Sequence, residues 1–218
     1  MDRIVQSKKA ELSNSAKLPF MQKLALTVAA SRRGDHLVLS ESFANPVLEV
    51  ITLFNRAVDE AVLGKYALAG GLAVEYYGAP INTVDADFLV VFPETAGGLL
   101  DASSFFDFFQ RNGAVASGEY LVFCDLKFQM IPANRDLDAE ALQAAVAISE
   151  KDVPFFVVTL EHLLALKLRA WRYKDRLHIN HLLDSEVPLD KSRLSNILER
   201  HQLKQRWQQL LNDRSESA

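Results

Sequence analysis

The stretch that decides the fold begins with Tyr66-Ala67-Leu68-Ala69-Gly70-Gly71 and resumes, after thirteen intervening residues, with Asp85-Ala86-Asp87-Phe88-Leu89-Val90-Val91-Phe92-Pro93. Short apolar runs that end at Gly-Gly or at Pro are typical of buried strands. The stretch therefore predicts one strand over residues 66–69 and a second, the clearest in the chain, over residues 86–92. Residues 72–77 predict a short helix between them, which Gly78 and Pro80 stop.

The two aspartates at the start of the second strand are the first candidate site. Side chains alternate along a strand, so Asp85 and Asp87 share one face while Ala86 and Phe88 share the other. Two carboxylates this close repel each other unless a cation lies between them. Mg²⁺ suits such oxygen ligands, because it commonly binds one or two carboxylates together with substrate phosphates.

The glycine pair adds a second candidate feature. Without Cβ atoms, Gly70 and Gly71 would let a phosphate approach backbone N–H groups at the start of a helix. A lone Gly-Gly or Asp-x-Asp more often marks a turn or a cap than a ligand site. Their order along these elements is what favours a site.

The rest of the chain predicts an α+β fold, in which a small mixed β-sheet lies between N-terminal helices and a helical C-terminal segment. The expected segments are a helical extension over 1–62, a core over 63–158 and a helical segment over 159–218. Helices are predicted from Pro19, from Asn45-Pro46 to Gly64, over 103–110, from a Thr159 cap to about 174, from an Asp190 cap, and over 203–211. Residues 119–123 and 126–131 predict either a hairpin turned at Cys124-Asp125 or one long strand, and 155–158 a last strand.

Composition bounds the class of protein. Of 218 residues, 49% are apolar and 24% charged, which excludes a disordered chain. One cysteine excludes a disulfide framework and a cysteine-based zinc site, and favours a reducing compartment. With no membrane-length apolar run and no signal-peptide pattern, we expect a cytoplasmic protein without a membrane partner.

The net charge of −4 conceals an asymmetry. Residues 1–160 carry a net charge of −7 and the remaining 58 residues one of +3. Opposite signs in two parts of a chain favour a polyanionic ligand shared between them. The alternative is an ordinary solvated helix face.

Three motifs together carry a family resemblance. They are Tyr66 to Ala73 with Thr83-Val84-Asp85-Ala86-Asp87-Phe88, then Leu126-Lys127-Phe128-Gln129-Met130-Ile131, then Glu161 to Leu168 followed by Arg172-Tyr173-Lys174-Asp175-Arg176. Over roughly residues 64–184 the chain resembles the DNA polymerase β-like nucleotidyltransferase superfamily. It is similar in particular to bacterial stand-alone nucleotidyltransferases related to the AbiEii-type toxins of toxin–antitoxin systems.

The resemblance implies a role for each matching residue. Asp85 and Asp87 would be catalytic and hold Mg²⁺, and Lys167 would act near the nucleotide phosphates. The residues implied in nucleotide binding are Gly70, Gly71, Thr83, Gln129, Lys174 and Asp175. On one ideal helix, Lys174 and His178 would share the side of Lys167, with Arg169, Arg172 and Arg176 opposite. We expect the Lys167 side to meet the nucleotide.

The implied activity is Mg²⁺-dependent transfer of an NMP from an NTP to an acceptor hydroxyl on RNA, protein or a small molecule. The chain could then be the toxin of a pair with a cognate antitoxin. Gln129, however, stands where the superfamily has its third carboxylate. This departure keeps a second hypothesis open, in which the chain is a degenerate, non-catalytic protein of this fold that binds nucleotide, RNA or a partner.

Overall fold

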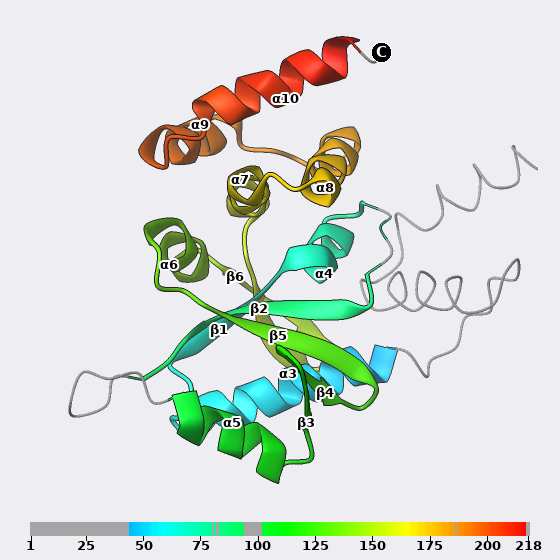
Figure 1. Ribbon diagram of the computed structural model, residues 1–218, viewed down its shortest axis with the longest axis vertical. Coiled ribbons are helices and arrows are strands. Elements are labelled where there is room, and N and C mark those ends of the chain that lie inside the picture. The colour runs from blue at the N-terminus through cyan, green and yellow to red at the C-terminus, as the bar shows by residue number, and fades with distance from the viewer. Residues whose placement is uncertain (1–43, 80, 82, 94–101, 186, 217–218) are drawn as a thin grey trace, which may run out of the picture.

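A computed structural model describes residues 44–79, 81, 83–93, 102–185 and 187–216, and the helix expected to begin at Pro19 lies outside this part of the chain. Seven described strands form one mixed sheet in the order β3-β4-β5-β2-β1-β7-β6 (Figure 1). The strands are β1 (Lys65–Ala69), β2 (Asp85–Val91), β3 (Val115–Ser117), β4 (Tyr120–Phe123), β5 (Leu126–Pro132), β6 (Val146–Glu150) and β7 (Val153–Val157). The pairs β2–β5 and β1–β7 are parallel and the other neighbours antiparallel.

Helices cover both faces of this sheet, which confirms the predicted α+β class (Figure 1). They are α3 (Ala44–Asp59), α4 (Gly70–Tyr76), α5 (Ala102–Arg111), α6 (Asp136–Gln143), α7 (Leu160–Ala170), α8 (Tyr173–Asp184), α9 (Lys191–Arg200) and α10 (Lys204–Glu216). α3 and α5 lie on one face, α4 and α6 on the other, and α7 to α10 extend beyond α4 and α6. None of the described helices has the length and apolar composition of a membrane span.

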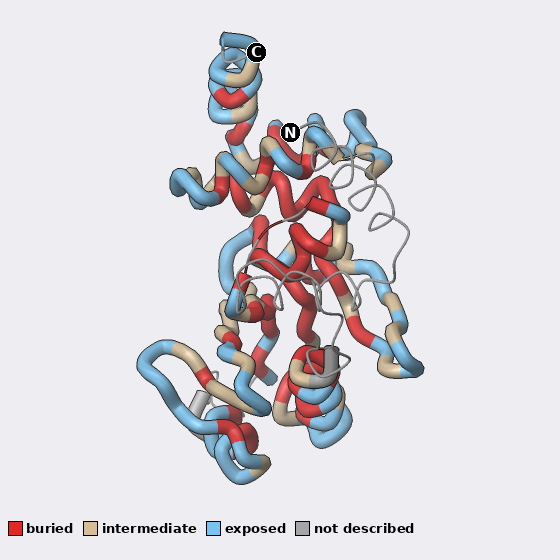
Figure 2. The backbone as a smooth tube through the Cα atoms, turned by 90° about the vertical axis from the view of Figure 1, so that its right-hand side faces the viewer, coloured by how far each residue is buried: buried red, intermediate tan, exposed pale blue. Residues whose placement is uncertain are grey.

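An aromatic cluster fills the space between the sheet and α3. The ring of Phe54 on α3 stacks on Phe88 of β2 at 4.2 Å between centroids, and lies 5.1 Å from Tyr66 of β1 and 5.0 Å from Phe109 of α5. Figure 2 shows the buried residues concentrated in the sheet and the helices against it, while α10 is mostly exposed. Since Phe88 points to α3, Asp87 beside it points to the opposite face, as the alternation predicts.

A two-residue turn settles the choice left open between a hairpin and one long strand. β4 and β5 are antiparallel partners, and Cys124 and Asp125 between them have φ values of 50° and 63°. Positive φ at both positions matches the tight hairpin turns that follow strand twist. The hairpin is therefore confirmed, and the long strand is wrong.

The helix expected to run from Thr159 to about residue 174 is broken. Thr159 caps α7 as predicted, but α7 ends at Ala170, Trp171 has a φ of 55°, and α8 starts at Tyr173. A residue distant in sequence stabilises this break: Arg206 of α10 donates hydrogen bonds to the carbonyls of Leu168 and Arg169 at 3.0 and 2.6 Å. The guanidinium of Arg206 also lies 5.7 Å from the Trp171 ring centroid.

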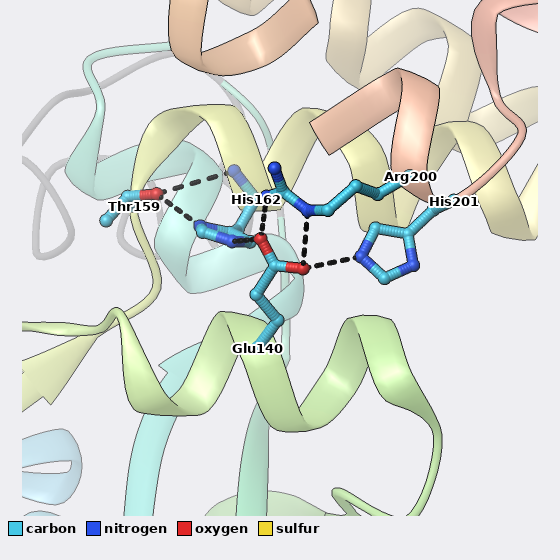
Figure 3. Close-up of polar contacts among 5 residues, drawn as sticks. All are labelled: Glu140, Thr159, His162, Arg200 and His201. Atoms are coloured by element: carbon cyan, nitrogen blue, oxygen red, sulfur yellow. Dashed lines mark hydrogen bonds and ion pairs between the residues drawn. The ribbon is translucent and has the colours of Figure 1, made fainter. Parts of the chain in front are cut away.

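A cluster centred on Glu140 of α6 joins the C-terminal helices to the rest of the fold (Figure 3). The Glu140 carboxylate pairs with the Arg200 guanidinium, with His201 Nε2 at 2.7 Å and with His162 Nε2 at 3.3 Å. Burial alone would raise the pKa of Glu140, but hydrogen bonds from Arg200, His201 and His162 outweigh it and lower the pKa from 4.5 to about 2.

Replacing Glu140 with glutamine is expected to lower the free energy of unfolding by about 1–2 kcal/mol at pH 7, because it removes charge-assisted hydrogen bonds that solvent partly screens. A carboxyl with a lowered folded-state pKa stabilises above its unfolded value and loses that effect as pH falls. The difference between wild type and Glu140→Gln should therefore shrink between about pH 4.5 and pH 2 in urea unfolding. Glu49→Gln, an exposed change on α3, is the control and should show no such loss.

Candidate active site

A pocket opens where β1, β2 and the start of α4 face α7 and α8. It holds about 720 Å³ of empty space, part of it open to solvent. Eight of the nine residues that the sequence predicted for the site line it: Gly70, Gly71, Thr83, Asp85, Asp87, Lys167, Lys174 and Asp175. Segments more than 90 residues apart thus meet at one place.

Glycine is required at positions 70 and 71, because the side chains of Asp87 and Thr83 lie too close for a Cβ atom. Gly70 has a φ of 59°, and a Cβ there would lie 1.8 Å from Asp87 Oδ2. A Cβ on Gly71 would lie 2.5 Å from Thr83 Oγ1. The sequence predicted small residues for the approach of a phosphate, and the structure adds a second reason, which is room for the Asp87 and Thr83 side chains.

Asp85 and Asp87 form the acidic side of the pocket. Thr83 Oγ1 donates a hydrogen bond to Asp85 Oδ1 at 2.8 Å and so orients that carboxylate. Burial raises the pKa of Asp87, the charge of Asp85 raises it further, and Lys167, Lys174 and Arg172 offset part of the rise. A bound cation would relieve this repulsion directly.

The carboxylate oxygens of Asp85 and Asp87 fit a Mg²⁺ ion that takes its remaining ligands from the substrate. No group of three or more His, Cys, Asp or Glu side chains able to hold a metal is found among the described residues. The Asp85–Asp87 pair still supplies two hard oxygen donors on one face of a strand, and Mg²⁺ is commonly bound through one or two carboxylates plus substrate phosphates. These two residues could hold the ion.

The basic side of the pocket is formed by Lys167 and Arg172, and Asp175 pairs with both of them. Lys167 Nζ lies 3.4 Å from Asp175 Oδ1, and Arg172 Nε lies 2.6 Å from Asp175 Oδ2. Burial lowers the pKa of Lys167, while Asp175 and Asp87 oppose that effect. Burial alone would raise the pKa of Asp175, but Arg172 and Lys167 hold it below its usual value. Asp175 therefore contacts and positions two cations of the pocket.

The predicted separation of lysine and arginine sides is wrong. It assumed one helix, whereas α7 and α8 are distinct, so Arg169 and Arg172 line the same pocket as Lys167 and Lys174. Arg176 alone of the three arginines turns away, and donates to the Trp171 carbonyl at 3.2 Å. The sequence analysis thus missed Arg172 as a pocket residue.

Gln129 is the predicted site residue that does not line the pocket. It pairs with Asp87 on the neighbouring parallel strand and is half-buried, so it lies next to the acidic side without entering it. Asp125, four residues earlier, is in the hairpin turn. Gln129 has no carboxylate and Asp125 does not line the pocket, so neither residue supplies a third carboxylate to the site.

Sequence analysis also missed an ion pair between two other pocket residues. Arg169 of α7 pairs with Asp138 of α6, and Asp138 is almost completely buried. α6 itself was not predicted, since residues 136–143 show only a weak apolar pattern. No local signal relates Asp138 to an arginine 31 positions later.

The chain has limited similarity to known proteins. No protein-family model matches the chain, and no curated protein is significantly similar to it. Among solved structures, it is similar to ANT(2″)-Ia in complex with adenylyl-2″-tobramycin, with 16% identity, a TM-score of 0.47, and coverage of 74% of this chain and 98% of that one. An antigenic nucleotidyltransferase-like protein from Paracoccidioides brasiliensis has 14% identity, a TM-score of 0.47, and coverage of 73% and 88%. The solution structure of the antibiotic-resistance factor ANT(2″)-Ia has 14% identity, a TM-score of 0.46, and coverage of 78% and 97%.

Proposed function

We propose that the protein is a Mg²⁺-dependent nucleotidyltransferase, which moves an NMP from an NTP to an acceptor hydroxyl. One observation carries this proposal: a carboxylate pair on β2 faces a cluster of cations from α7 and α8 across a single pocket. A triphosphate needs cations for its oxygens, and a metal that bridges it needs carboxylates. The pocket offers both within reach of one ligand.

In the proposed reaction, the acceptor oxygen forms a bond to the α-phosphorus and the bond to the β-phosphate oxygen breaks, releasing pyrophosphate. Asp85 and Asp87 would hold Mg²⁺, which when bound neutralises phosphate charge and orients the triphosphate. Lys167, Lys174 and Arg172 would pair with the phosphate oxygens, and Asp175 keeps Lys167 in place. One of the two carboxylates would accept the hydroxyl proton.

The finer proposal concerns the acceptor and the biological role. The motifs shared with AbiEii-type nucleotidyltransferases support a role as the toxin of a toxin–antitoxin pair, with RNA or protein as the acceptor and a cognate antitoxin as partner. The hypothesis of a non-catalytic binding protein is supported by Gln129, an amide beside Asp87 where a third carboxylate is expected.

Isothermal titration of ATP with and without Mg²⁺ is expected to show binding that strengthens at least about tenfold with the metal, a difference of about 1.4 kcal/mol. α-Labelled NTPs should then transfer label to an RNA, protein or small-molecule fraction of a cell extract. Metal-dependent binding without transfer to any fraction would favour the non-catalytic protein. No binding of ATP even with Mg²⁺ would contradict the proposed function.

A further inference from the structure

A row of polar residues continues from Asp87 across β5 to β4. Gln129 of β5 pairs with Asp87 on the neighbouring parallel strand. Leu121 of β4 pairs with Phe128 of β5, so the same antiparallel register places Tyr120 beside Gln129. Paired residues of neighbouring strands point to the same face of a sheet. Asp87, Gln129 and Tyr120 therefore share one face, in a row that leads away from the acidic side of the pocket.

This part of the sheet face is accessible. Tyr120 and Gln129 are partly exposed, and Ser117, which pairs with Tyr120 on β3, is exposed. On the opposite face, Leu121 and Phe128 are buried. The helices α4 and α6, which lie on the same face as the row, pack on β1 and β2. Tyr120 and Gln129 do not line the pocket, so the row extends the candidate site beyond it.

Tyr120 is close enough to the acidic pair for the charges to act on its phenol. Partial burial raises the pKa of Tyr120, and the negative charges of Glu119, Asp85 and Asp87 raise it further. Two strand spacings, about 10 Å, separate its backbone from that of Asp87, and a tyrosine side chain can span much of that distance. The phenol is neutral at pH 7, so it can both donate and accept a hydrogen bond.

The proposed reaction needs its acceptor on this side of the acidic pair. In-line transfer places the entering oxygen and the leaving pyrophosphate on opposite sides of the α-phosphorus. Lys167 and Lys174, which would hold the pyrophosphate, come from α7 and α8, and α7 follows β7. In the sheet, β7 and β1 lie on one side of β2, whereas β5 and β4 lie on the other. The acceptor would therefore approach over β5 and β4.

We propose that this strand face binds the acceptor and that Tyr120 holds it by a hydrogen bond through the phenolic oxygen, an inference that rests on the proposed function. The acceptor carries a hydroxyl, which donates and accepts as the phenol does. Gln129 lies between Tyr120 and Asp87 in the row, and its amide also donates and accepts. Gln129 then contacts the acceptor instead of the metal, which gives a reason for an amide at this position.

The test measures transfer from α-labelled NTPs, with Mg²⁺, at increasing concentrations of a cell extract that supplies the acceptor. Tyr120→Phe removes the phenolic oxygen and keeps the ring. It should raise the extract concentration that gives half-maximal transfer by about 3–10-fold, the value of one hydrogen bond. Its affinity for Mg²⁺-ATP in isothermal titration should equal that of wild type, because Tyr120 lies outside the pocket. Tyr173→Phe makes the same change at an exposed position of α8 and should match wild type in both measurements.

The outcomes separate this inference from the proposed function. A higher half-maximal extract concentration in Tyr120→Phe only, with unchanged ATP affinity, supports the role of Tyr120. An unchanged half-maximal concentration, or a weaker affinity for Mg²⁺-ATP, overturns that role and leaves the proposed function in place. A wild type that transfers no label to the extract overturns both. Thermal melting of each variant shows that the comparison is made between folded proteins.

Discussion

Replacing Asp87 with asparagine is expected to reduce nucleotidyl transfer by about 10³-fold, because the neutral amide can neither bind Mg²⁺ strongly nor accept a proton. The fold should persist. Asparagine keeps the size of the side chain that lies against Gly70, and it removes a charge that burial and Asp85 already disfavour. Its thermal midpoint should equal or exceed that of wild type.

The measurement is transfer of α-labelled NMP in a cell extract, with thermal melting alongside. Asp125→Asn makes the same chemical change in the β4–β5 turn, outside the pocket, and should leave transfer unaltered. If the protein is a toxin, growth should stop on expression of wild type and of Asp125→Asn but continue with Asp87→Asn. Undiminished transfer by folded Asp87→Asn would show that the chemistry lies elsewhere.

The acidic half of the pocket could be predicted from local sequence. β1 and β2 are short apolar runs with Gly-Gly and Pro at their ends, and alternation along β2 separates Asp87 from Phe88 without any tertiary information. The charge asymmetry agrees with the placement of Lys167 and Lys174, which come from the positive segment and line the same pocket as the two carboxylates.

The basic half could be predicted only in part, because tertiary contacts decide its geometry. Trp171 is neither Gly nor Asn, so nothing local indicates a left-handed residue there. The helix ends at that point since Arg206, 35 positions later, bonds to its last carbonyls. That break rotates α8 relative to α7 and brings Arg172 to the pocket. The edge strand β6 was missed for a different reason, because its mostly exposed residues lack an apolar alternation.

Replacing Asp175 with asparagine is expected to lower the free energy of unfolding by about 3 kcal/mol and to weaken binding of Mg²⁺-ATP. Asp175 and Lys167 are both buried, with 1% and 6% exposure, so removing the carboxylate leaves a buried ammonium without its partner. Asp184→Asn is a matched control on the same helix as Asp175: it removes an exposed pair with Arg214 of α10 and should lower stability by less than about 1 kcal/mol.

The loss of Asp175 should also make binding depend on pH. Burial already lowers the pKa of Lys167, and Asp175 is the larger of the charges that oppose this. Without it the pKa falls further, and because a lysine is charged only below its pKa, the ammonium is lost progressively as pH rises. The affinity of Asp175→Asn for Mg²⁺-ATP, relative to wild type, should therefore fall progressively as pH rises.

A second substitution, Lys167→Met, should recover much of the stability, because the buried ammonium that lost its partner is then also removed, but none of the nucleotide affinity. Equal stability of Asp175→Asn and Asp184→Asn would instead show that the buried pair does not hold Lys167 in the pocket.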